Sequence, residues 1–69
     1  MFTIDASKIR SLMFEHNVSG VYDLARKAKL NELTASKVLK DGAVVTAKTI
    51  SALAKFFGIN GNDLILKKE

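Results

Sequence analysis

Residues 31–42 constrain the fold most, because this short stretch carries a helix start, an apolar face and a helix stop. Asn31 can accept a backbone N–H of the first turn, and Glu32 suits the positive end of a helix. Gly42 can adopt the left-handed conformation that ends a helix. The stretch therefore predicts one short helix that begins at Asn31 and ends at Gly42.

The residue spacing divides this helix into two faces. At about 100° per residue, Ala35, Val38 and Leu39 share the face that is expected to pack inward. The opposite face is expected to meet a partner, and it carries Leu33, Ser36, Lys37 and Lys40. Because Ala35 is small, a preceding helix can cross closely over it, which is the packing of a helix-turn-helix recognition helix.

Length and composition limit the class of protein. A chain of 69 residues predicts a single domain over residues 1–69, with no room for a deep enzyme cleft. The 48% hydrophobic content is too high for a disordered tail, and the apolar runs are too short to cross a membrane. Eleven basic against seven acidic residues give a net charge of +4, which is compatible with a polyanionic partner.

Several types of site have no support in the sequence. The absence of cysteine excludes disulfides and thiolate metal sites, and no nucleophile and base, glycine-rich phosphate loop or metal-ligand cluster is spaced for chemistry. We therefore expect no catalytic site, metal, cofactor, small-molecule ligand or membrane contact. The first residues lack the layout of a signal peptide, which makes the cytoplasm the expected compartment.

The remaining residues predict three more helices and two ends that can pair. Apolar spacing predicts helices over about 5–16, 21–28 and 46–57, with Ser19 as a candidate cap of the second and Gly58 ending the last. Residues 43–45 read as a loop. Residues 63–66 read either as a helical turn or as a strand, and a strand there would pair with residues 2–4 as a short ribbon.

Two stretches of the chain together resemble a known family: DLARKAKLNELTASKVLKDG, followed by KTISALAKFFGINGNDLI. The resemblance is to the small Cro and repressor-type (XRE-like) helix-turn-helix proteins of phages and mobile elements. In the first stretch the matching features are the Leu24-Ala25 pair, the apolar corner at Leu30, the capped helix from Asn31 and the helix-ending Gly42. In the second stretch they are the helix with Ile50, Leu53, Ala54 and Phe57, which ends at Gly58, and the Asp63-Leu64 pair near the end of the chain. It implies an all-α, lambda-repressor-like domain of four or five helices, in which the second and third helices read DNA.

The chain departs from the family pattern at the positions that would meet DNA. The family usually has glycine at the turn, where this chain has Lys29, and often has glutamine at the start of the second helix, where this chain has Val21. The first exposed positions of the third helix usually hold Gln, Ser, Thr, Asn or Arg. Here they hold Glu32 and Leu33, an acidic and an apolar residue.

The expected binding residues follow from this alignment of motifs. On the reading surface, Lys37 would reach a guanine edge or a phosphate, Leu33 a thymine methyl group and Glu32 a cytosine amine. The full set expected to bind DNA or a partner is Val21, Tyr22, Asn31, Glu32, Leu33, Thr34, Ser36, Lys37 and Lys40. The expected phosphate contacts are Arg26, Lys27, Lys29 and Lys48. The alternative for the outer face of the third helix is a merely solvated surface, which leaves Leu33 unexplained.

Two functions from different classes remain open. The first is a phage or mobile-element transcription regulator in a lysis–lysogeny-type switch, which binds operator DNA through its third helix. Such a small module would bind as a dimer, with Phe2, Ile59 and Leu64 as candidate contacts if they are exposed. The second is an antirepressor that binds the helix-turn-helix of a partner phage repressor through the same helix. The antidote of a toxin–antitoxin pair shares this fold and stays open as well.

Overall fold

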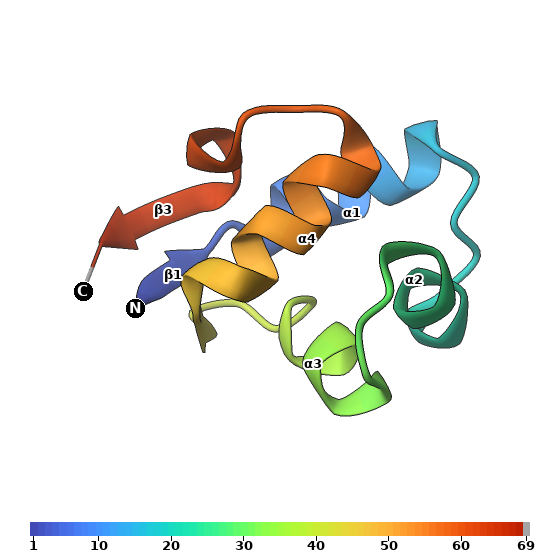
Figure 1. Cartoon of the computed structure of the whole chain (residues 1–69), viewed down its shortest axis with the longest axis horizontal. Coiled ribbons are helices and arrows are strands. Elements are labelled where there is room, and N and C mark those ends of the chain that lie inside the picture. The colour runs from blue at the N-terminus through green and yellow to red at the C-terminus, as the bar shows by residue number, and fades with distance from the viewer. Residues whose placement is uncertain (69) are drawn as a thin grey trace.

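The computed structural model describes residues 1–68 of the chain. Figure 1 shows the small sheet at one end of the molecule and helices α2 and α3 at the other, with α4 between them. The elements in chain order are β1 (Phe2–Ile4), α1 (Ala6–Glu15), α2 (Val21–Ala28), α3 (Glu32–Lys37), β2 (Val44–Val45), α4 (Ala47–Phe57), the 3₁₀ helix η1 (Gly61–Leu64) and β3 (Ile65–Lys68).

Side-chain caps start three of the four α-helices. Asp5, Asn31 and Thr46 each accept a hydrogen bond from the backbone N–H three residues along, at the starts of α1, α3 and α4. These bonds satisfy N–H groups that have no partner inside a helix. Gly58 ends α4 in the left-handed conformation, with φ +71°. The predicted starts of these helices and the stop at Gly58 are confirmed.

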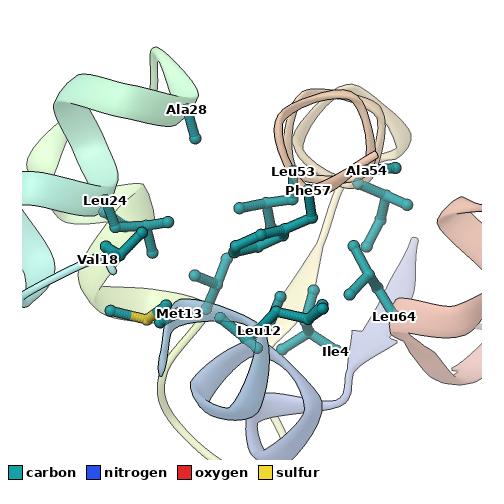
Figure 2. Close-up of a cluster of buried hydrophobic side chains, with 14 of the residues drawn as sticks. Ile4, Leu12, Met13, Val18, Leu24, Ala28, Leu53, Ala54, Phe57 and Leu64 are labelled. Carbon is teal, nitrogen blue, oxygen red and sulfur yellow. The ribbon is translucent and has the colours of Figure 1, made fainter. Parts of the chain in front are cut away.

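One hydrophobic cluster joins all the helices (Figure 2). Leu24 of α2 and Leu53 of α4 are completely buried, and Ala35 lets α3 pack closely beneath α2. The apolar stripes predicted for the helices are confirmed, since the buried residues include Ile9, Leu12, Met13, Leu24, Ala25, Ala28, Ala35, Val38, Ile50, Leu53, Ala54 and Phe57. The core therefore fixes α2 and α3 against α4 as one unit.

The sheet corrects the all-α expectation. The ribbon between the two ends is present, because β1 pairs antiparallel with β3, with Ile4 opposite Ile65. Residues 43–45 are not simply a loop: Val44 and Val45 form β2 and pair with the other edge of β1, which gives the order β2-β1-β3. A strand of two residues has no alternation to detect, and it forms only because β1 provides a partner from a distant part of the sequence.

Two local expectations were wrong, and one conditional candidate is ruled out. Helix α3 ends at Lys37, and Gly42, with φ +80°, lies in the turn beyond it. Ser19 does not cap α2, whose N-cap is Gly20. Leu64 is completely buried, so it is not a candidate for a contact between copies of the chain. The backbone N–H of Ser19 donates to the Asp23 carboxylate instead, and the residues after Lys37 form tighter turns, in which Leu39 and Lys40 each donate to the carbonyl three residues before.

Candidate nucleic-acid interface

The outer surface of α3 is exposed, as the residue spacing predicts. Glu32 and Lys37 are exposed and Ser36 is half-buried, while Ala35 and Val38 lie fully buried beneath them. Leu33 is 85% exposed, which is unusual for a large apolar residue and is not explained by the core. The remaining candidates on or beside the helix are Thr34, which is half-buried, and Lys40 and Asn31, which are exposed.

A hollow between α2 and α3 adds apolar surface beside Leu33. Ala25 and Leu30 line it together with the exposed residues Tyr22 and Leu33, and Arg26, Asn31 and Glu32 complete its lining. Tyr22 is 73% exposed. Val21 is half-buried and packs against the core. The structure thus brings Tyr22, Glu32 and Leu33 together around one hollow and leaves Val21 outside its lining.

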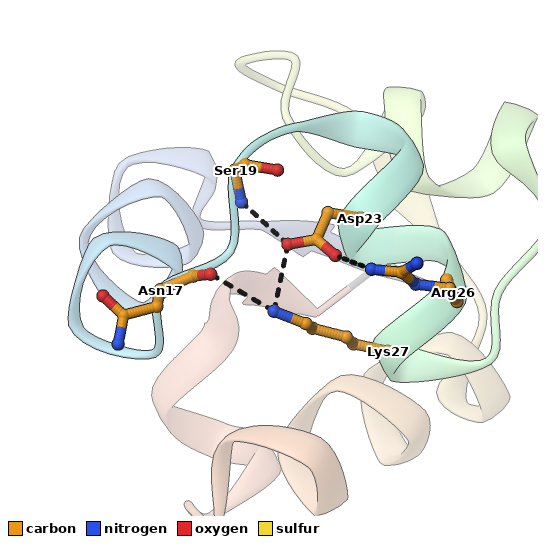
Figure 3. A network of polar contacts seen from close by, with 5 residues as sticks. All are labelled: Asn17, Ser19, Asp23, Arg26 and Lys27. Atoms are coloured by element: carbon orange, nitrogen blue, oxygen red, sulfur yellow. Dashed lines mark hydrogen bonds and ion pairs between the residues drawn. The ribbon is translucent and has the colours of Figure 1, made fainter.

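A polar network at the start of α2 uses two of the predicted phosphate contacts (Figure 3). Asp23 accepts the backbone N–H of Ser19 at 2.9 Å and pairs with Arg26 at 2.6 Å and Lys27 at 3.0 Å. The Lys27 ammonium also donates to the Asn17 carbonyl at 3.2 Å. The backbone N–H of Ser19 and the Lys27 ammonium hold the pKa of the Asp23 carboxyl well below its usual range. Lys27 therefore joins α2 to the preceding turn, and its charge is partly balanced within the protein.

The turn between α2 and α3 contains a residue in an unfavourable conformation. Lys29 follows α2 in the left-handed region, with φ +59° and ψ +44°. Glycine adopts this region without a steric penalty, whereas a residue with a Cβ does not. The position where the resembling family usually has glycine therefore needs the glycine-like conformation in this chain too.

Arg10 fixes the turn that follows α3, and sequence reasoning missed this role. Its guanidinium donates to the Leu39 carbonyl at 3.0 Å and approaches the Asp41 carboxylate at 3.5 Å. The contact joins α1 to residues about 30 positions away, so no local pattern indicates it. The Asp23 pairs were also missed, although the spacing of Asp23 to Arg26 and Lys27 is the i,i+3 and i,i+4 spacing of helical ion pairs.

Comparison with known proteins decides the family. The profile of the Cro/C1-type HTH DNA-binding domain matches residues 8–66, which include α2, α3 and α4 completely. The chain belongs to the Cro/C1-type helix-turn-helix DNA-binding family. This membership makes it a DNA-binding transcription regulator in broad class, with α2 and α3 as its helix-turn-helix. No curated protein and no solved structure matches the chain.

Residues 1–68 lack two features that would indicate another type of site. No helix there is long and apolar enough to cross a bilayer. No group of three or more His, Asp or Glu side chains is arranged to hold a metal ion in that part of the chain. The candidate interface of this Cro/C1-type domain is the exposed side of α3 together with the hollow beside it.

Proposed function

We propose that residues 1–69 form a single helix-turn-helix domain that regulates transcription in a lysis–lysogeny-type switch of a phage or mobile element. Its third helix, α3, enters the major groove of operator DNA and reads its sequence. The observation that carries this proposal is the surface of α3. The side chains of Glu32 and Lys37 on α3, and of Lys40 just beyond it, form no hydrogen bond or ion pair with any described residue, while the helix itself is anchored in the core.

The residue types on α3 suggest what each would read. Lys37 donates to a guanine edge or a phosphate, and Thr34 and Ser36 donate to bases or phosphates. Leu33 contacts a thymine methyl group, the apolar feature that the major groove offers. Glu32 accepts from a cytosine amine, and it repels phosphates, so it favours specificity over affinity.

A domain with one short reading helix is expected to act as a dimer. Two copies would place their α3 helices in half-sites about one helical turn apart. With Leu64 in the core, the exposed apolar residues at the sheet end are Met1 and Leu66, which are 57% and 64% exposed. We propose that contacts between copies use this end, away from α3.

The test is a fluorescence anisotropy titration of the chain against duplex DNA that adjoins its own gene. Sequence-specific binding is expected to be tight, to survive competition with unrelated duplex and to weaken from 50 to 200 mM salt, because bound lysines release counterions. Equal affinity for related and unrelated duplexes would reject sequence-specific regulation.

A second function is favoured by one observation, the exposed apolar hollow between α2 and α3. An antirepressor would use Leu33 and Tyr22 as apolar anchors against the helix-turn-helix of a partner repressor. Glu32 would pair with a basic residue that the repressor otherwise offers to DNA. Such a chain would not bind the operator itself, and adding it would release the repressor from the operator.

Two substitutions separate these functions. In an antirepressor, Glu32→Lys and Leu33→Ala are both expected to abolish the complex with the repressor, measured by anisotropy with labelled operator. Phe14→Ala is the matched control, because Phe14 is an apolar residue on α1 that is 87% exposed and lies outside both proposed contact surfaces. Retention of the repressor complex by both variants would reject this interface.

A further inference from the structure

Two adjoining hollows run from the start of α3 along one side of α4. The first lies between the α2–α3 turn and the start of α4, and the second lies between α2 and the later part of α4. They share Lys29 and Ala52 in their linings. Four lysines line the pair, which we call the lysine trough: Lys27, Lys29, Lys48 and Lys55. No carboxylate is among the residues that line either hollow.

Three of these four positive charges are available to a partner. Lys27 is held by Asp23 and by the Asn17 carbonyl. Lys29, Lys48 and Lys55 make no hydrogen bond or ion pair with any residue in the described part of the chain. Lys48 and Lys55 lie seven residues apart on α4, which is about 10 Å along the helix axis. The unpaired lysines are therefore spread along the trough and are not clustered at one place.

Lys29 places a lysine side chain in the trough although its backbone conformation favours glycine. It is exposed, and its left-handed φ of +59° would be relaxed by glycine. Backbone strain of this kind persists only where the surrounding structure enforces it, and it clusters at functional sites. Lys29 and Ala52 line both hollows, and Lys29 is the charged residue of the two.

The occupant is indicated by the chemistry at the α3 end of the trough. Asn31, Thr34 and Thr49 line the first hollow together with Lys29 and Lys48. Amide and hydroxyl groups with ammonium groups are the donors that proteins present to phosphate oxygens. Asn31 and Thr34 belong to the cap and first turn of α3, so the trough is continuous with the surface proposed to read DNA.

We propose that the lysine trough holds the phosphodiester backbone of the DNA strand that borders the major groove occupied by α3. Lys29, Lys48 and Lys55 contact successive parts of one strand, which carries one phosphate per about 3.4 Å of helix axis. Lys55 is thereby an additional phosphate contact, distant from α3 along the trough. This inference rests on the proposed DNA-binding function. It explains how a helix as short as α3, with six residues, is held in the groove.

The test compares the salt dependence of duplex binding for the unmodified chain, Lys29→Gly, Lys48→Ala and Lys55→Ala. The slope of log affinity against log salt is expected to fall by about 0.9 for each lysine removed. Between 50 and 200 mM salt, each variant would then lose about 3.5-fold less affinity than the unmodified chain. Lys8→Ala is the matched control, since Lys8 is an exposed lysine on α1 outside the trough, and its slope is expected to be unchanged.

Lys29→Gly separates binding from folding. Because glycine relieves the left-handed strain, the variant is expected to melt at a higher temperature while it binds DNA more weakly. A more stable variant with weaker binding cannot be explained by damage to the fold.

The experiment distinguishes failure of the proposed DNA binding from failure of the trough inference. If the unmodified chain binds no duplex, the proposed function fails. If it binds duplex and the three trough variants keep its slope, the trough inference is overturned. Unchanged DNA slopes together with weaker binding of the variants to a partner repressor would assign the trough to a protein and would also overturn it.

Discussion

Helices α2 and α3 pack against the same core but use their charged residues in opposite ways. In α2, Asp23 binds Arg26, Lys27 and the backbone N–H of Ser19. The charges of this helix therefore pair with one another and with the turn before it. In α3, Glu32 and Lys37 bind no other residue in the part of the chain that the structure describes. The charged residues of α2 thus hold their own helix and the turn before it, whereas those of α3 stay unpaired in the described part of the chain.

Helix α3 is held in place although its own charges do not pair. Helix α3 has only six residues, too few to be stable alone, and depends on the Asn31 cap and on buried Val38. Arg10 then fixes the turn that follows it through the Leu39 carbonyl. Anchoring at both ends lets the outer side chains vary in sequence without loss of the helix.

The strongest test of this contrast replaces one leucine on each helix. Leu24→Ala removes a completely buried side chain of α2, and we expect it to lower the free energy of unfolding by about 2–5 kcal/mol. Leu33→Ala removes a leucine that is 85% exposed, and we expect a change within about 0.5 kcal/mol. Urea unfolding followed by circular dichroism measures both. Comparable losses for the two variants would show that Leu33 is part of the core.

A smaller effect is expected where the free charges of α3 meet DNA. Lys37→Ala should weaken sequence-specific binding by roughly 1–3 kcal/mol, because a contact to a base or phosphate is lost, and should leave the free energy of unfolding nearly unchanged. Glu32→Gln is the companion variant, with equal or tighter binding expected once a charge that repels phosphates is removed. Anisotropy titrations measure both affinities. Unchanged affinity for Lys37→Ala would exclude this placement of α3.

The smallest expected effect concerns the ion pairs that Asp23 forms with Arg26 and Lys27 on α2. Because folding lowers the pKa of Asp23, its carboxylate stabilises the fold above the unfolded pKa of about 4, and this contribution is lost progressively as the pH falls from there toward the lower pKa of the folded chain. Urea unfolding of the unmodified chain and of Asp23→Asn at pH 6, 4 and 2.5 measures it. The difference in unfolding free energy is expected to be largest at pH 6 and to shrink toward pH 2.5. A difference that stays constant with pH would assign the effect of Asp23 to its size and not to its charge.

Much of the helical fold can be predicted from the sequence, because the caps and apolar stripes are local signals. Asn31, Thr46 and Gly58 take the roles that their residue types predict. Strand β2 could not be predicted, since Val44 and Val45 become a strand only by pairing with β1. Helix α3 ends at Lys37 rather than near Gly42, because Leu39 and Lys40 donate to the carbonyls three residues before them and tighten the chain into turns.

The sequence predicted which residues of the candidate site are exposed, but not which of them lie next to one another. Periodicity placed Leu33 and Lys37 on the outer side of α3, where the structure also has them. It could not show that Tyr22 and Leu33 share a hollow, or that Lys55 lines a trough with Lys29, because these pairs meet only through tertiary packing.

The central claim, that α3 reads DNA, is tested most directly by nuclear magnetic resonance of the ¹⁵N-labelled chain titrated with its cognate duplex. We expect the largest amide shift changes over residues 31–37, smaller changes at Lys29, Lys48 and Lys55 beside the trough, and little change at the exposed end of α1. Shift changes concentrated on the sheet end, with residues 31–37 unaffected by saturating duplex, would contradict the account.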